Sequence, residues 1–423
     1  MSGSGMRMKG PLGGLRVVEL GHVMAGPVGG LLLADMGADV VKVEKLPGGD
    51  DTRRTVPPEI NGESASFMML NRNKRGIAVN LKSFEGRGVV ERLIAKADVV
   101  IENYRPGTME KLGLPYTSLQ ASNPGLVYCK ITGFGITGPY ANRAGYDLIS
   151  QGMSGLMGLT GEGPGRPPVK VGVPVGDVTA GILAATGVLA AYIERLRTGI
   201  GQYVDTSLLE ASIVHTYWPA AMAFATGQSA GPMGSAHPVA APYQAFRTQD
   251  GWINIGAISQ ATWMGVAKVL GAPTLLTDPR FASNAARMTN LAELVESMSQ
   301  ILQTHPTDYW VLEFERAGVP AGPVKTMAQV LDDPQTRARD MVVQVDHPVA
   351  GPVDAIGCPI KFSHGNGMTR RAAPIYGQHT AEIMSELGYT AADIERLASS
   401  DAVHVPASIT DEIGTFSDQE TIV

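Results

Sequence analysis

Short β-like runs alternate with helical runs near the start of the chain, and this alternation restricts the fold more than any other feature. Leu15–Leu20 is typical of a strand, the apolar run Pro27–Met36 of a helix, and Asp39–Glu44 of a second strand. Parallel strands need a crossover connection of about a dozen residues, which is usually a helix. A strand–helix–strand order therefore indicates two parallel strands. The same order continues over Gly76–Asn80, Glu85–Ala97, Asp98–Glu102 and Gly125–Ile131. The sequence therefore predicts a doubly wound α/β domain.

Ligands of such domains bind at the carboxyl ends of the strands. We therefore expect the site in the loops that follow Leu20, Glu44, Glu102 and Ile131.

A long aliphatic run with a single acid at its start forms a second marker. Asp177 lies in Val173–Gly181, and the run ends in Arg195, Arg197 and Gly199, which is typical of a helix C-terminus. The amides and dipole of a helix N-terminus favour a negative charge at Asp177. By position alone its commoner role is an N-cap that accepts a hydrogen bond from the amide of Thr179 or Ala180. A catalytic acid is the alternative.

The length of 423 residues predicts two domains. Gly227–Pro242 is rich in turn-forming residues, and after it a strand at Gly251–Gly256 and helices near 260–270, 290–304 and 307–317 form a smaller unit. The expected divisions are a disordered lead-in at 1–10, a first part of the large domain at 11–200, a linker helix and loop at 201–231, a small α+β domain at 232–325, a second part of the large domain at 326–405 and a polar tail at 406–423.

Composition narrows the function classes. The net charge of −6 offers no basic surface for nucleic acid, and Cys129 and Cys358 form no CxxC pair, so we expect neither a metal site nor a redox pair. We expect no apolar run to reach the ~18–20 residues that span a bilayer. The first residues lack the apolar core of a signal peptide. These features predict a cytoplasmic protein with no membrane partner.

Common nucleotide signatures are missing. The first strand is followed by Gly21–Pro27 instead of GxGxxG, and the sequence contains no Walker A, GxSxG or HExxH motif. Cations near strand ends would suit a phosphorylated ligand if they converge, and are otherwise solvated surface charges. They are Lys45, Arg53, Arg54, Arg72, Lys74, Arg75, Lys82, Arg105, Lys111 and Arg143.

Eight motifs in order along the chain resemble the class III CoA-transferases, the formyl-CoA and carnitine CoA-transferase type. They are His22–Pro27, Gly37–Glu44, Asn71–Gly76, Glu102–Gly107, Gly133–Pro139, Arg143–Asp147, Gly176–Gly181 and Gly357–Phe362. The resemblance implies a Rossmann-like large domain built from both ends of the chain, a smaller domain inserted between them, and a homodimer of two interlocked subunits.

The resemblance also implies site residues. Asp177 matches the family's nucleophile, which attacks an acyl-CoA thioester and forms covalent aspartyl intermediates without a metal. Asp147, His237 and Tyr243 are weaker candidates for contact with the acid. Coenzyme A, a substrate here, is expected to contact Met24, Ala25, Lys45, Val79, Asn80, Leu81, Lys82, Asn103, Tyr104, Arg105, Lys111, Arg143, Ala144, Gly145 and Tyr146.

Departures from the family pattern bear on the substrate. Formyl-CoA transferases carry Gln at the position of Met24 and a glycine run where this chain has Gly234–Phe246, which favours an acid larger than formate or oxalate. The 2-methylacyl-CoA racemases of the family carry His at the position of Tyr146, and a phenol is a poor base at neutral pH. Transfer of CoA between organic acids is therefore the leading hypothesis. A racemase and a non-catalytic CoA-binding dimer are the alternatives.

Overall fold

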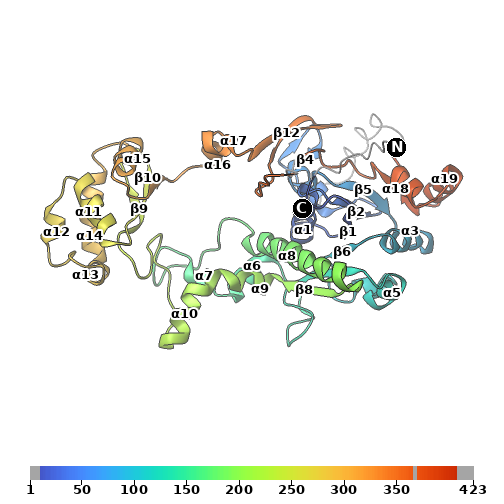
Figure 1. Ribbon diagram of the computed structural model, residues 1–423, viewed down its shortest axis with the longest axis horizontal. Helices are drawn as coiled ribbons and strands as arrows, with labels where there is room; N and C mark the ends of the chain where they lie inside the picture. The colour runs from blue at the N-terminus through green and yellow to red at the C-terminus, as the bar shows by residue number, and fades with distance from the viewer. Residues whose placement is uncertain (1–9, 365–368, 407–423) are drawn as a thin grey trace. The chain divides into compact units, whose positions relative to one another are not determined.

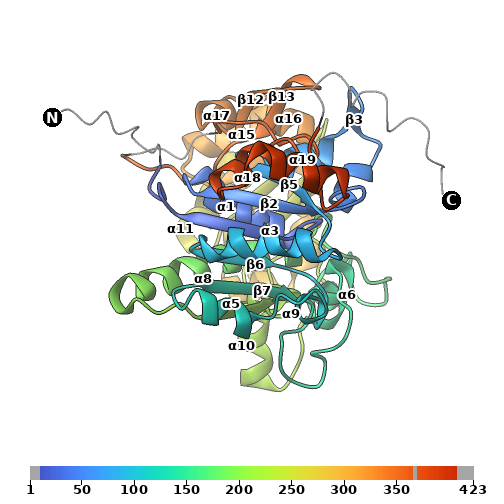
Figure 2. The same ribbon diagram turned by 90° about the vertical axis from the view of Figure 1, so that its right-hand side faces the viewer.

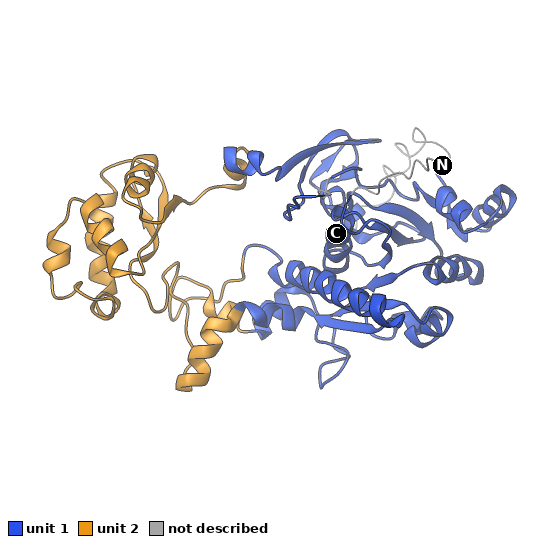
Figure 3. Cartoon of the chain, viewed as in Figure 1, with its two compact units in different colours: residues 1–154, 172–215, 334–423 blue, residues 155–171, 216–333 orange. Residues whose placement is uncertain are grey.

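The computed structural model describes residues 10–364 and 369–406, so almost all of the predicted lead-in and tail lies outside the described residues (Figure 1). The chain divides into two compact units, which Figure 3 colours blue and orange. Unit 1 comprises 1–154, 172–215 and 334–423, and unit 2 comprises 155–171 and 216–333.

Unit 1 is built on a seven-stranded sheet in the order β14-β5-β2-β1-β6-β7-β8. All neighbouring strands are parallel except β14, which pairs antiparallel with β5. The large parallel sheet confirms the predicted α/β class. The strands are β1 Arg16–Leu20, β2 Asp39–Lys45, β5 Arg75–Val79, β6 Val99–Glu102, β7 Val127–Thr132, β8 Tyr203–Ser207 and β14 Val403–His404.

Helices cover both faces of this sheet, because successive strand residues point to opposite sides. Val18 and Leu20 pack with helices α3, α5, α18 and α19 (Figure 2), and Val17 packs on the other face with α1 and α8. These helices are α1 Ala25–Asp35, α3 Phe84–Ala95, α5 Tyr116–Ser122, α8 Val175–Thr198, α18 Thr380–Glu386 and α19 Ala391–Ser399. Other elements of unit 1 include α2 Ala65–Asn71, α4 Thr108–Lys111, α6 Asp147–Met153, α9 Leu208–Ile213, β12 Val342–His347 and β13 Gly351–Ile356.

Helices α1 and α8 approach closely at glycines. A Cβ on Gly181 would lie 2.7 Å from the Val28 Cβ and 2.8 Å from the Ala25 carbonyl oxygen, and one on Gly29 would lie 3.3 Å from the Gly181 oxygen. Only a residue without a side chain allows this separation at position 181. The contact joins the beginning of α1 to the first turns of α8.

The long α8 ends at Gly199, whose left-handed conformation and amide bond to the Arg195 oxygen form the expected C-terminus. The helix is long and apolar enough to span a bilayer by length and composition, with 39% of its most apolar window buried, so the judgement that no run reaches that length was wrong. Because α8 packs against α1 and the sheet, we interpret it as a core helix of unit 1.

Unit 2 contains a three-stranded antiparallel sheet, in the order β11-β10-β9, and a helical layer. Its strands are β9 Tyr243–Arg247, β10 Trp252–Gly256 and β11 Ala321–Pro323. The strand and helices expected in this region form, and Trp263, Phe281 and Phe314 lie in its core. The main helices are α10 Tyr217–Thr226, α11 Gln260–Val269, α14 Leu291–Leu302 and α15 Thr307–Arg316.

Candidate active site

The carboxyl ends of the parallel strands collect the predicted loops at one edge of the sheet. Lys45 ends β2, Lys82 follows β5 and Arg105 follows β6, and all three side chains are exposed. These strands are close in the sheet order, so their carboxyl ends lie at the same edge. This edge of the sheet therefore carries exposed basic side chains.

Asp177 lies in the first turn of α8, as its third residue. The predicted N-cap role was wrong, because the helix begins after Pro174 and no side chain of the N-cap residue caps it. The cap is supplied instead by Asp147 of α6, whose Oδ1 accepts hydrogen bonds from the amides of Gly176 at 2.8 Å and Asp177 at 3.4 Å. The carboxylate of Asp177 is therefore not used to satisfy its own helix.

Neighbouring polar groups hold the Asp147 carboxylate in place. Gln151, one turn further along α6, donates from Nε2 to the Asp147 Oδ2 at 2.7 Å. Ser212 of α9 bonds to Ser150 at 3.1 Å behind this pair. A Cβ on Gly176 would lie 2.7 Å from the Ser212 Oγ and 2.8 Å from the Ser150 Oγ, so the packing requires glycine there.

Burial and the Asp147 carboxylate raise the pKa of Asp177 to about 7, in that order of importance. Desolvation disfavours the charged form, and a like charge nearby acts in the same direction. No ion pair to the Asp177 carboxylate is present among the described residues, while the dipole of α8 favours its ionised form. A carboxylate with a pKa near neutrality and no bound cation has the properties of a reactive group.

The glycine contact between helices brings Asp177 towards the start of α1. Asp177 lies four residues before Gly181 and thus on the same face of α8, and Gly181 approaches the Ala25 carbonyl. The point at which α8 contacts Ala25, one of the predicted CoA residues, is therefore one helical turn from the predicted nucleophile along α8.

The other predicted CoA residues differ in the burial and the contacts of their side chains. Those of Val79 and Leu81 are buried in the core, so only their backbone can meet a ligand. The Asn103 side chain is engaged twice with the His22 backbone, at 2.9 Å in each direction. Lys45 pairs with Asp51 at 2.7 Å, and the Arg143 guanidinium lies 3.9 Å from the centre of the Tyr140 ring.

Not all ten cations near strand ends are available to a ligand, because several of them form structural ion pairs. Arg53, Arg72 and Lys74 are nearly covered and paired with Glu44, Asp35 and Glu19. Arg75 begins β5 at the amino end and pairs with Asp39 at 2.6 Å. Buried cations need such partners, since an unpaired charge in the interior is costly.

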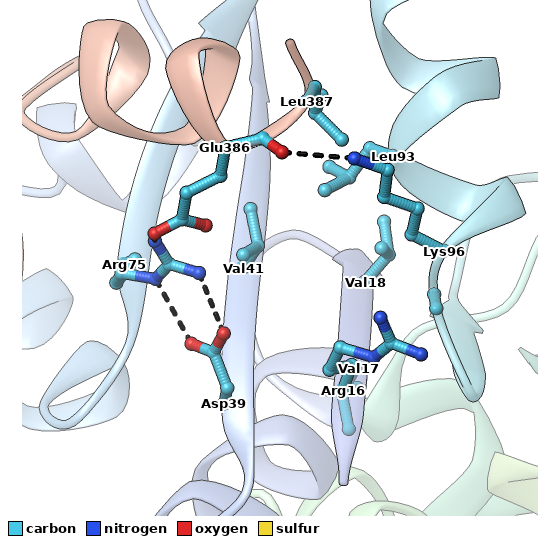
Figure 4. A pocket seen from close by; sticks show the side chains of 11 residues that line it. Arg16, Val17, Val18, Asp39, Val41, Arg75, Leu93, Lys96, Glu386 and Leu387 are labelled. Atoms are coloured by element: carbon cyan, nitrogen blue, oxygen red, sulfur yellow. Dashed lines mark hydrogen bonds and ion pairs between the residues drawn. The ribbon is translucent and has the colours of Figure 1, made fainter. Parts of the chain in front are cut away.

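A cavity of about 250 Å³ opens at the amino edge of the same sheet (Figure 4). It lies among Val17, Val18 and Val41 of β1 and β2, beside the ion pair of Arg75 with Asp39, and Lys96 donates to the Glu386 carbonyl at 2.9 Å. None of the residues predicted to contact CoA or the acid lines it, and Asp177 lies in the first turn of α8 at the opposite, carboxyl edge.

Two weaker candidates, His237 and Tyr243, are brought together within unit 2. The His237 amide donates to the Tyr243 carbonyl at 3.0 Å, and the ring centres are 5.0 Å apart. The Val239 amide donates to the His237 Nδ1 at 3.2 Å, so the neutral ring carries its proton on Nε2.

Tyr146, which precedes α6, has a side chain that is 69% exposed.

Sequence reasoning missed Gln151, Ser150 and Ser212 as support for the site. The spacing of Asp147 and Gln151, four residues apart on one helix, was a usable signal for the first of them. Ser212 gave no signal, because it comes from a helix far along the chain.

The described residues contain no group of three or more His, Cys, Asp or Glu side chains arranged to hold a metal ion.

Comparison with known proteins identifies the family of this chain. The chain matches the family described as CoA-transferase family III over residues 12–380, and it belongs to this family. It is a family III CoA-transferase, an assignment in agreement with the resemblance deduced from the motifs.

Several relatives are similar along most of their length. The succinyl-CoA:glutarate CoA-transferase of Mus musculus is 38% identical, covering 93% of this chain and 90% of the relative. The succinate–glutarate CoA-transferase of Agrobacterium fabrum is 39% identical over 90% of this chain and 96% of its own. A CAIB/BAIF family protein from Brucella suis has a crystal structure with a TM-score of 0.82 and 42% identity, covering 90% of this chain and 100% of that one.

Proposed function

We propose that this enzyme transfers CoA between organic acids through covalent intermediates on Asp177. The observation that carries the proposal is the Asp177 carboxylate, partly buried, with no cation bound to it among the described residues, close to the start of α1. An ionised carboxylate oxygen can attack a thioester carbonyl, and the helix amides and dipole favour its ionised form.

The reaction divides into four balanced steps. The Asp177 carboxylate attacks the acyl carbonyl of the donor, so a mixed anhydride forms and the CoA thiolate leaves. The thiolate then attacks the aspartyl carbonyl, which gives an aspartyl-CoA thioester and releases the donor acid as its carboxylate. The acceptor carboxylate attacks this thioester and expels the thiolate again. Attack of the thiolate on the new acyl carbonyl frees Asp177 and forms the new acyl-CoA.

Only the ionised form of Asp177 begins this sequence. With a pKa of about 7, a sizeable share of the molecules carries the carboxylate at neutral pH. The carboxylate is then poorly solvated, which increases its reactivity over that of an exposed aspartate.

For the acids, we propose succinyl-CoA as donor and a dicarboxylic acid as acceptor. The proposal is supported by the names of relatives, which include transferases from succinyl-CoA to glutarate, D-citramalate and mesaconate. The proton on the His237 Nε2 is a donor suited to a carboxylate, and Tyr243 lies beside it.

For CoA, we propose contact with the backbone at Met24, Ala25, Val79 and Leu81 and with the exposed cations Lys45, Lys82 and Arg105. These positions follow strands of one sheet at their carboxyl ends, which is where α/β folds bind ligands. Arginine and lysine side chains suit the phosphates of CoA. We also propose Asn80, Asn103, Tyr104, Lys111 and Arg143–Tyr146 as members of this site.

We further propose a homodimer with interlocked subunits. An exposed apolar stripe along α8 supports it: Ile182, Ile193 and Leu196 are 45%, 51% and 68% exposed. Exposed apolar rows of this kind mark interaction surfaces. Light scattering after size exclusion should report about twice the chain mass of 44.5 kDa, and a stable monomer at nanomolar concentration would contradict it.

A trapping experiment tests the mechanism. The enzyme is incubated with succinyl-CoA, glutarate and hydroxylamine, and its peptides are analysed by mass spectrometry. We expect a hydroxamate on Asp177, formed by attack of hydroxylamine on an aspartyl anhydride or thioester, and none when succinyl-CoA is omitted. Turnover without any labelling of Asp177 would rule out the covalent mechanism.

A further inference from the structure

The turn that joins β1 to α1 rests on a cluster of buried charges. Lys42 and Lys74 lie beneath it with Glu19 and Asp50, and all four side chains are almost completely buried. The Lys42 Nζ is 3.0 Å from the Glu19 Oε1 and 2.8 Å from the Asp50 Oδ2. The Lys74 Nζ is 2.7 Å from the Glu19 Oε2, so two cations match two carboxylates.

The members of this cluster bond to the backbone of the turn itself. The Lys42 Nζ donates to the Gly21 carbonyl at 2.8 Å, and the Val23 amide donates to the Asp50 Oδ1 at 3.1 Å. The cluster therefore anchors the turn at the Gly21 carbonyl and at the Val23 amide. Asn103 of the neighbouring strand end holds the residue between them, His22, by its amide and its carbonyl.

The backbone conformation of this turn is unfavourable for the residue type found there. Val23 has a φ of +66°, in the left-handed region that β-branched residues rarely adopt, and its side chain is 44% exposed. The Val23 side chain is only partly buried, so its packing offsets little of this strain, and the hydrogen bond from its amide to Asp50 helps to keep the backbone there. Strain of this kind persists where the surrounding structure imposes it, and it gathers at functional sites.

We propose that Asp50 and Lys42 are positioning residues that hold the turn Gly21–Met24 in the shape that receives CoA. The inference rests on the CoA contacts proposed above at Met24 and Ala25. Neither side chain reaches the ligand, because both are covered. Their effect passes through the backbone of the turn to the first residues of α1.

The packing around the turn leaves it little other freedom. A Cβ on Gly26 would lie 3.0 Å from the Gly21 Cα, and one on Gly30 would lie 2.0 Å from the Glu19 Oε2. The start of α1 is therefore pressed against the turn and the charged cluster together. A change in the turn is transmitted directly to Met24 and Ala25.

The test compares two buried aspartates of unit 1 at opposite ends of α1. Asp50→Ala removes the anchor of the turn, and Asp35→Ala is the matched control, since Asp35 is buried and paired with Arg72 near the end of the helix. CoA binding is measured by calorimetry on the full chain, together with kcat and KM for succinyl-CoA and the melting temperature.

We expect Asp50→Ala to raise the Kd for CoA and the KM for succinyl-CoA by about tenfold or more, with kcat at saturation changed by less than about threefold. Asp35→Ala should lower the melting temperature but leave the Kd within about twofold. A purely structural role of Asp50 would make the two variants alike. Equal CoA affinity in folded Asp50→Ala and wild type would overturn the inference, as would equal weakening by Asp35→Ala.

Two further variants decide the matter if Asp50→Ala does not fold. Asp50→Asn keeps an acceptor oxygen for the Val23 amide but removes the charge that holds Lys42, so we expect the Kd to rise by about threefold. An unchanged Kd in this variant would contradict the inference. Val23→Gly, added to Asp50→Asn, should recover part of the affinity, because glycine adopts positive φ without an anchor. Further weakening would contradict it.

The wild type separates this inference from the proposed function. If the wild-type chain bound no CoA, the proposed CoA site itself would fail. If it bound CoA and the Asp50 variants bound equally well, only the positioning role would fail.

Discussion

A comparison of Asp177, partly buried at the start of α8, with Asp50, buried beside the turn that precedes α1, shows how neighbouring charges set the pKa of an aspartate. At the start of α8, burial and the neighbouring Asp147 carboxylate raise the pKa of Asp177 to about 7. Beside the turn that precedes α1, Asp50 lies against Lys42 and accepts bonds from Thr52, which outweigh burial and hold its pKa well below the usual range. The same type of side chain therefore has a pKa near neutrality in one place and stays an anion in the other.

The difference between the two pKa values follows mainly from the neighbouring charges. Burial penalises both carboxylates, and only Asp50 has a cation 2.8 Å away to offset the penalty. The network around Asp50 is close to neutral as a whole, and the same burial lowers the pKa of Lys74 to about 8 despite Glu19. Matched charges support structure, whereas we propose that the unmatched one at Asp177 supports chemistry.

The strongest test of this contrast removes the unmatched carboxylate. Asp177→Asn should lower kcat by at least about a thousandfold, because the amide cannot form the covalent intermediates. CoA affinity should stay within about threefold, since Asp177 is not among the proposed CoA contacts. Asp346→Asn, an exposed residue of β12, is the control and should keep full activity. Substantial transfer by Asp177→Asn would mean that its unusual pKa has no role in catalysis.

The second test measures the effect of the unmatched Asp177 charge on the free energy of unfolding. A carboxyl whose pKa is raised on folding contributes stability at low pH, and this is lost as the pH rises through about 7. Asp177→Asn should therefore unfold at a higher denaturant concentration than wild type at pH 8, and the gain should shrink towards pH 4. The shift from 3.8 to about 7 sets an upper bound of about 4 kcal/mol on the gain. A destabilised variant at pH 8 would show that Asp177 is stabilised as an anion, like Asp50.

A smaller effect is expected from the packing that holds Asp147 against α8. Gly176→Ala would bring a Cβ to 2.7 Å from the Ser212 Oγ, and we expect a loss of about 1–3 kcal/mol in the free energy of unfolding, with reduced kcat. Gly172→Ala is the matched control, since a Cβ there meets nothing within 4 Å. Chemical denaturation of both variants measures the difference. Equal stability would show that the start of α8 tolerates displacement.

The last test expects no effect at all. A racemase needs a second base across from the aspartate, and the position that carries His in racemases is the exposed Tyr146. In heavy water, a 2-methylacyl-CoA should keep its configuration and its α-hydrogen over many turnovers, as followed by mass spectrometry and chiral analysis. Rapid deuterium uptake with inversion would move Asp177 from nucleophile to general base.

The sequence by itself determined the order of strands and helices in the parallel sheet and the place of Asp177 at the start of a helix. Alternating β-branched and apolar helical runs predicted β1, α1, β2 and their successors, because side-chain periodicity is a local property. It also marked Asp177 as an acid at a helix start, and the family motifs pointed to CoA transfer. The C-terminus of α8 was predicted for the same reason, since Gly199 and the basic last turn are local signals.

Only the tertiary structure decided which charges pair and which stand alone. Asp147 lies about thirty residues before Asp177 in sequence, yet it caps α8, and this leaves the Asp177 carboxylate uncommitted. Arg72 and Lys74, read as possible phosphate ligands, proved to be buried partners of Asp35 and Glu19. The reason is physical: the protonation and role of an ionisable group depend on burial and on neighbours within a few ångströms, and those neighbours come from distant parts of the chain.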